Sequence, residues 1–99
     1  MVRTVVRPIV NEFVEREIMP RTNKIYYKEI LQIVKKEFIP NPEIRKKIKA
    51  DPRLKNLTSQ QIGSLLNRSF DQISRMITYK LANSGYDMKE RGTYYSREK

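Results

Sequence analysis

The chain has 99 residues, of which 38% are hydrophobic and 32% charged, and it contains neither cysteine nor histidine. This composition is ordinary for one globular domain. The missing residue types leave no disulfide, no thiolate nucleophile and none of the strongest transition-metal ligands, so we expect no enzyme activity, no metal site and no cofactor. The net charge of +10 favours a polyanionic partner such as nucleic acid, the alternative being a generally charged, soluble surface.

The positive charge is concentrated in one part of the chain. Residues 21–57 carry eleven basic and four acidic side chains, whereas residues 1–20 are balanced at three of each. No apolar run approaches the roughly 20 residues that cross a bilayer, and the N-terminal sequence lacks the pattern of a signal peptide. We expect a cytoplasmic protein without a membrane partner.

The first predicted element is a helix that starts near Pro8 and ends before Pro20, with apolar residues repeating at helical spacing. Residues 1–20 hold more apolar surface than one helix usually buries against a small core, so we predict that this segment forms a homodimer interface. The alternative is that the helix completes the core of a monomer. The predicted dimer contacts are Val6, Ile9, Val10, Phe13 and Val14.

Two more helices are predicted in the basic part of the chain. Thr22 or Asn23 can cap a helix whose inner face carries Tyr27, Ile30, Leu31, Val34 and Phe38. Asn41-Pro42 then has the pattern of a helix cap followed by a first-turn proline, and Asp51-Pro52 ends this short basic helix. Its charged residues Arg45, Lys46, Lys47 and Lys49 form a phosphate-binding surface or simply a solvated face. No internal repeat is evident.

The strongest local signals lie in residues 57–85. Thr58 and Gln61 have the spacing of a capping box, and the helix that they open stops near Asn67. Ser69 and Gln72 repeat that spacing, so a second helix follows after a three-residue turn. The second helix turns Phe70, Ile73, Ile77 and Leu81 inward and stops at Ser84-Gly85.

After Gly85 the sequence changes to a strand pattern. Tyr86 and Met88 alternate with polar residues, residues 89–92 form a turn, and Thr93-Tyr94-Tyr95 is rich in strand formers. The predicted fold class is mainly α with a small β-hairpin. Tyrosines interleave with basic residues here and at Tyr26-Tyr27. Such tyrosines can stack on the bases of single strands, but their spacing favours packing in the core and strands.

The segment Gln60–Leu81, with Gly63 for close helix approach, Asn67 at the turn, Ser69 as cap and Ile73 buried, resembles the helix-turn-helix of bacterial and archaeal regulators. The following GYDMKERGTYY is similar to a wing. The resemblance is to the winged helix-turn-helix superfamily of DNA-binding proteins, including small crenarchaeal plasmid and virus proteins. It implies that residues 21–99 form a winged DNA-binding domain with an extra N-terminal helix. Residues 40–56 are longer than the usual connection between the first helix of such a domain and its helix-turn-helix.

The resemblance implies that the second helix enters the major groove of duplex DNA and that the wing contacts the backbone or minor groove. The predicted recognition-helix contacts are Ser69, Gln72, Ser74, Arg75, Thr78 and Tyr79. The predicted phosphate and wing contacts are Arg68, Lys46, Lys47, Lys89 and Arg91. Arg75 and Gln72 have the side chains for bidentate contacts with guanine and adenine.

These residues predict a sequence-specific DNA-binding protein, first of all a transcriptional regulator. The alternative is a plasmid-partition adaptor that binds a site or spreads along DNA, and either role allows a partner protein of a transcription or partition complex. A winged-helix protein-interaction module is a weaker alternative, because its contact face would expose more apolar area.

Overall fold

The computed structural model describes residues 2–97. Outside it lie Met1, the first residue of the predicted N-terminal segment 1–20, and residues 98–99, the last of the predicted domain 21–99. The first half of the chain contains two helices, each prolonged by a π-helical turn, and one short strand. In chain order these are α1 (Val2–Phe13), η1 (Val14–Ile18), β1 (Lys24–Tyr26), α2 (Tyr27–Ile33) and η2 (Val34–Phe38).

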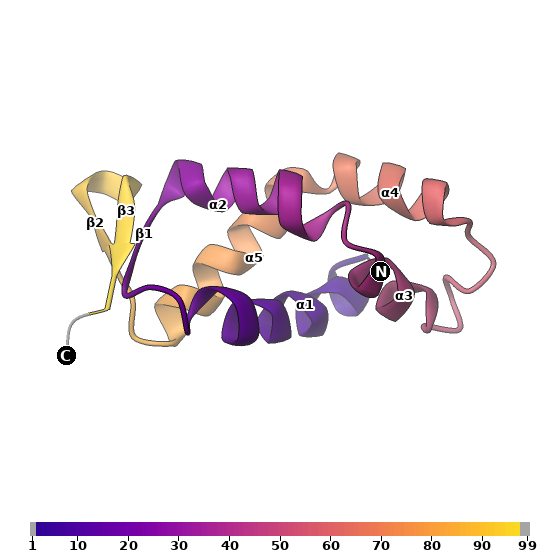
Figure 1. Ribbon diagram of the computed structural model, residues 1–99, viewed down its shortest axis with the longest axis horizontal. Coiled ribbons are helices and arrows are strands. Elements are labelled where there is room, and N and C mark those ends of the chain that lie inside the picture. Colours follow the sequence, from indigo (N-terminus) through magenta and orange to yellow (C-terminus); the bar gives the residue numbers. More distant parts are fainter. Residues whose placement is uncertain (1, 98–99) are drawn as a thin grey trace.

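The second half contains three helices and a hairpin. They are α3 (Pro42–Lys49), α4 (Ser59–Arg68), α5 (Phe70–Asn83), β2 (Asp87–Lys89), the 3-10 turn η3 (Glu90–Gly92) and β3 (Tyr94–Ser96). The molecule measures 44 × 21 × 19 Å, with the sheet at one end of the long axis and α3 near the other (Figure 1). The predicted class, mainly helical with a small antiparallel hairpin, is confirmed. Within residues 2–97 no helix has the length and apolarity needed to span a bilayer.

The sheet has three strands rather than the two predicted. Its order is β1-β3-β2 and both pairs are antiparallel, with Ile25 opposite Tyr95 and Tyr95 opposite Met88. The backbone N–H of Tyr26 donates to the Glu29 carboxylate at 3.1 Å, which caps α2. The prediction that Thr22 or Asn23 caps this helix is therefore wrong, and Tyr27 is exposed rather than inward.

Helix α1 is part of the single hydrophobic core and packs against α5 and α3. Four of the five predicted dimer contacts, Val6, Val10, Phe13 and Val14, are at most 7% exposed within one chain, and Ile9 is half-buried. Phe13 meets Phe38 edge to face, with ring centroids 5.3 Å apart. The side chains predicted to form a dimer interface are thus covered within one chain by α5, α3 and Phe38, and a homodimer through them has no support in the structure.

The start of α1 also differs from the prediction. The helix begins at Val2 and carries Pro8 in its interior rather than in its first turn. Pro8 has no N–H to donate to the Thr4 carbonyl, four residues earlier. Pro8 and Thr4 are both exposed, so water can reach the carbonyl and the helix continues through the proline.

The two π-helical turns share a short sequence pattern, although no internal repeat was expected. Residues 14–20 (VEREIMP) and 34–40 (VKKEFIP) both fit Val-x-x-Glu-x-x-Pro. In each, the N–H of the residue before proline donates to the carbonyl of the valine five residues earlier, at 2.9 Å. An α-helical turn would bring the proline ring against the carbonyl four residues before it, and the wider turn relieves that clash. Arg21 joins the two turns by ion pairs with Glu17 and Glu37, at 3.0 and 3.4 Å.

Helices α4 and α5 are joined by one residue, Ser69, and not by the predicted three-residue turn. The Ser69 N–H donates to the carbonyls of both Leu65 and Leu66 at 3.1 Å, which keeps α4 helical through Arg68. The backbone of Asn67 does not adopt the left-handed conformation that often ends a helix, since among the described non-glycine residues only Glu90 and Arg91 have positive φ. Its amide instead donates to the Gly63 carbonyl at 2.9 Å.

Gly63 allows a close approach, but its neighbour is Arg45 and not α5 as predicted. A Cβ at Gly63 would lie 2.7 Å from the Nη2 atom of Arg45. The Arg45 guanidinium crosses this glycine and donates to the Ile39 carbonyl at 2.9 Å and to Ser59 at 3.2 Å. Arg45 therefore ties α3 to the start of α4, which assigns it a structural role.

Candidate nucleic-acid interface

The predicted recognition helix α5 has one solvent-facing side. Arg75 and Tyr79 are exposed, Tyr79 at 71%, while Gln72 and Thr78 are half-buried at the edges of this side. The Thr78 hydroxyl donates to the Arg75 carbonyl at 2.8 Å. We call this surface, which also includes Asp71 near the helix N-terminus, the α5 face. The α5 face contains four of the six predicted recognition-helix contacts, namely Gln72, Arg75, Thr78 and Tyr79.

The other two predicted contacts, Ser69 and Ser74, are buried. Ser74 is fully inaccessible, and its hydroxyl donates to the Phe70 carbonyl at 3.0 Å. Ser69 is 9% exposed at the junction with α4, and its side chain makes no capping bond to α5. The prediction that Ser74 lies on the outward face is wrong, because α5 packs against both α1 and the α2–η2 helix, which narrows the exposed side of α5. Ser69, predicted as a helix cap and a DNA contact, is instead buried at the junction.

A groove runs along the α5 face where α1 lies beside α5, and sequence reasoning missed it. Arg7 and Asn11 line it from α1, and neither was among the predicted contacts. From α5 it is lined by Gln72, Arg75, Met76, Tyr79, Lys80 and Asn83. No acidic side chain is among these residues. We call it the α1–α5 groove. The signal in the sequence was Arg7 and Asn11, spaced i and i+4.

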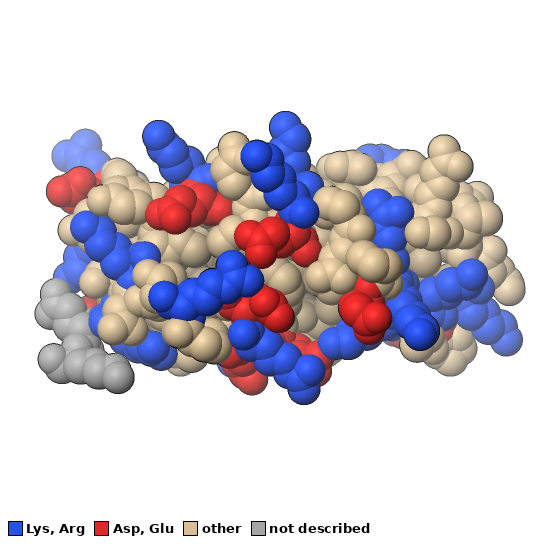
Figure 2. Space-filling model, in the orientation of Figure 1, with Lys and Arg blue, Asp and Glu red and all other residues tan. Residues whose placement is uncertain are grey.

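The acidic side chains of α1 and η1 form ion pairs with basic side chains. Glu12 pairs with Arg16 and Lys47, and Glu15 pairs with Lys80 at 2.7 Å. The hydrogen bond from the Lys47 ammonium, and next the charge of the Arg16 guanidinium, lower the pKa of the Glu12 carboxyl. Figure 2 shows acidic and basic side chains intermixed on one face of the molecule. Within residues 2–97, the α5-face guanidinium of Arg75 and the neighbouring Arg7 have no carboxylate partner within 4.0 Å.

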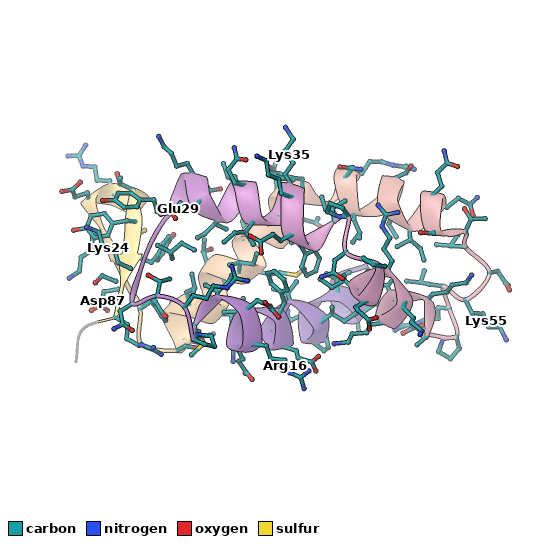
Figure 3. The ribbon with its side chains drawn as sticks, in the orientation of Figure 1. Arg16, Lys24, Glu29, Lys35, Lys55 and Asp87 are labelled. Atoms are coloured by element: carbon teal, nitrogen blue, oxygen red, sulfur yellow. The ribbon has the colours of Figure 1, made fainter. Side chains whose placement is uncertain are left out.

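The two predicted lysines of α3 differ in their surroundings. Lys47 faces α1 and is bonded to Glu12, whereas Lys46 is exposed and has no such partner among the described residues. Lys46 is therefore the more available of the two for the predicted phosphate contact. Arg68 is also exposed, at the last turn of α4. Basic side chains thus extend to both ends of the molecule, as Lys24 and Lys55 show in Figure 3.

The hairpin presents Arg91 at its tip. Glu90, Arg91 and Gly92 have φ values of 48°, 57° and 90°, and the Thr93 N–H closes the turn on the Lys89 carbonyl at 3.1 Å. Positive φ costs an ordinary L-residue about 1–2 kcal/mol, so the turn holds Arg91 outward at the expense of backbone strain. Lys89 is half-buried at the end of β2, and Arg91 is exposed.

The tyrosines divide between core and surface. Tyr86 and Tyr95 are buried, and the Tyr86 hydroxyl donates to the Thr22 carbonyl at 2.6 Å. Tyr26 pairs with Tyr94 on the sheet, with centroids 5.5 Å apart, and the Lys24 ammonium lies 4.5 Å from the Tyr94 ring centre. The tyrosines therefore mainly pack the core and the sheet.

Residues 2–97 contain no group of three or more Asp and Glu side chains arranged to bind a metal ion. Comparison of the chain with models of protein families, with curated proteins and with solved structures finds no match.

Proposed function

We propose that this protein binds duplex DNA through the α5 face, with α5 in the major groove. The observation that carries the proposal is the chemistry of that face: Gln72, Arg75 and Thr78 are donors and acceptors suited to base edges. They stand on a helix beside an acid-free groove. The net charge of +10 supplies the long-range attraction that binding to phosphates requires.

The order of elements around α5 supports a winged helix-turn-helix arrangement as part of this proposal. Helix α4 precedes α5, and the β2–β3 hairpin follows it, with β1 completing a three-stranded sheet. In such an arrangement the hairpin is the wing, and Lys89 and Arg91 contact the backbone or the minor groove. The one-residue junction at Ser69 and the inserted helix α3 distinguish this chain from the usual pattern.

A transcriptional regulator is the role that we propose first, and a partition adaptor that spreads along DNA would use the same interface. Footprinting on a long DNA fragment separates the two, because a regulator protects a bounded site and a spreading adaptor protects DNA outward from its site. No observation favours the interaction module. Among residues 2–97 the large exposed hydrophobic side chains are divided between the sheet end and α5, and the α5 face carries one of them; they are Tyr26, Tyr27 and Met88 at the sheet end and Tyr79 on α5.

Binding-site selection with the purified protein, followed by anisotropy measurements on selected and random duplexes, tests the proposal. Arg75→Ala should reduce the discrimination between the two duplexes by about 1–3 kcal/mol. The matched control is Arg16→Ala, which removes the same charge from the exposed lower edge of the molecule in Figure 3. The control should leave discrimination unchanged.

Two outcomes count against the proposal. Failure of the intact protein to bind any duplex at low salt rejects DNA binding. Equal weakening of the selected and random duplexes by Arg75→Ala removes Arg75 from base recognition and assigns it to the phosphates.

A further inference from the structure

The two grooves that border α1 differ in charge. The α1–α5 groove on one side contains Arg7, Arg75 and Lys80 without an acidic lining residue. The groove on the other side, between α1–η1 and α3, is lined by three glutamates, Glu12, Glu17 and Glu43, together with the two cations Arg16 and Lys47. Only the first groove therefore offers an anion a site without a facing carboxylate.

The α1–α5 groove also varies along its length. Arg7 shares one end with Gln72, Arg75 and Tyr79, and Asn11 follows one turn later beside Tyr79 and Asn83. At the far end Lys80 is neutralised by its 2.7 Å ion pair with Glu15. The uncompensated positive charge is thus at the Arg7 end, next to the residue proposed to contact bases.

The dimensions of DNA place a phosphate at that end of the groove. A helix with its side chains is about 10–12 Å across, and the major groove is about 12 Å wide, so α5 alone fills it. A helix packed beside another lies about 8–10 Å from it. Helix α1, packed on α5, would consequently lie over the sugar-phosphate strand that borders the groove.

We propose that Arg7, assisted by Asn11 and the Tyr79 hydroxyl, forms a phosphate-binding site that holds this bordering strand while α5 contacts the bases. The inference rests on the proposed function and gives α1 a part in it. The guanidinium donates bidentate bonds to a phosphodiester, and the amide and phenol supply neutral donors. Because phosphates carry no sequence information, Arg7 positions α5 and does not select the site.

Arg7→Ala and Arg16→Ala form a matched pair that tests the site, since both remove one cation from α1–η1, on opposite sides. Arg7→Ala should weaken selected and random duplexes alike, by about tenfold. It should also reduce the slope of log affinity against log salt concentration by about 0.9. Arg16→Ala should change neither as much, and Arg7→Lys should keep the slope while binding more weakly than the intact protein.

Duplexes in which single phosphates are replaced by neutral methylphosphonates identify the contact. One position on the bordering strand should weaken binding of the intact protein, and the same replacement should have no effect on Arg7→Ala. If no position loses its effect in Arg7→Ala, or if Arg7→Ala and Arg16→Ala behave alike, the inference is wrong while DNA binding by α5 stands. If the intact protein binds no duplex, the proposed function fails and the phosphate site fails with it.

Discussion

At the scale of single residues, the contact between Gly63 and Arg45 has a measurable energy. Alanine at position 63 improves helix propensity by about 0.5–1 kcal/mol, but its Cβ displaces the Arg45 guanidinium from the Ile39 and Ser59 acceptors, which costs about 1–2 kcal/mol. We expect Gly63→Ala to lower the free energy of unfolding by about 0.5–1 kcal/mol in the intact chain.

The same substitution should raise the free energy of unfolding by about 0.5–1 kcal/mol in an Arg45→Ala background, because the obstruction is gone. Urea denaturation of the four proteins measures this double-mutant cycle. Additive effects would show that the guanidinium does not occupy the space above Gly63.

Asp51 gives a pH-dependent prediction. Its carboxylate accepts bonds from the Arg53 side chain at 2.9 and 3.0 Å and from the Arg53 N–H at 2.8 Å, which lowers its pKa to about 2. Because the pKa is depressed in the folded state, the stabilisation is present above about pH 4 and is lost as the pH falls toward 2. An NMR titration of the Asp51 carboxyl should show this value.

Arg53→Ala should raise the pKa of Asp51 only part of the way to its usual value, because the backbone N–H of residue 53 still donates to the carboxylate. An Asp51 pKa near 4 in the intact protein would contradict the ion pair.

At the scale of elements, the proline inside α1 predicts a gain of stability on its removal. Pro8→Ala restores the N–H that the Thr4 carbonyl lacks, and Pro8 is exposed. We expect the free energy of unfolding to rise by about 1–3 kcal/mol. Pro20→Ala is the control, because Pro20 lies after η1, where its loss frees the unfolded chain and should destabilise by about 0.4–1 kcal/mol.

Denaturation with urea distinguishes the two signs. A loss of stability in Pro8→Ala would mean that α1 depends on the proline for its path over α5.

Three helix boundaries that depend on local bonds were predicted correctly from the sequence, whereas the local cap of α2, from Tyr26 to Glu29, was not. The Thr58–Gln61 capping box forms both of its bonds, at 2.9 and 3.1 Å, and the Asn41 side chain accepts from the Glu43 N–H at 2.9 Å. The predicted end of α5 at Ser84-Gly85 is also correct, since the helix ends at Asn83 and Gly85 has a φ of +95°. Each of these devices involves residues within a few positions of one another, so the sequence contains all of the partners.

Features that depend on distant partners were not predicted. Strand β1 was missed because its partner, β3, lies at the other end of the chain. The capping box predicted from the Ser69–Gln72 spacing does not form, because α4 continues through Arg68. Of the site, Arg75 and Tyr79 lie on the exposed side as predicted, but Ser74 and the part played by α1 depend on how helices pack around α5, which periodicity alone does not determine.

At the scale of the whole molecule, the buried face of α1 predicts the consequence of placing a charge there. Phe13→Glu introduces a carboxylate against Phe38, in a site that is 7% exposed. Loss of the ring costs about 3–5 kcal/mol, and burial of the charge adds to it. We expect this variant to unfold, whereas Arg16→Glu, at an exposed position of the same helical segment, should stay folded.

Circular dichroism and sedimentation equilibrium together check the result. A Phe13→Glu variant that keeps its helix content while the mass falls from a dimer to 11.9 kDa would restore α1 as a dimer interface.

The pairing of β1 with β3 also governs the order in which the molecule assembles. Residues 24–26 and 94–96 must meet across the segment that contains α2 to α5, and the entropy of closing so long a loop is lost before any bond between β1 and β3 forms. Helix formation is local and fast by comparison. In refolding kinetics the helical signal should therefore develop before the signal of Tyr86, whose hydroxyl reaches Thr22 only when the sheet end closes. The long-range β1–β3 pair therefore forms after the helices and after the local β2–β3 hairpin, so that the last partly folded form has its helices and hairpin but lacks the edge strand β1.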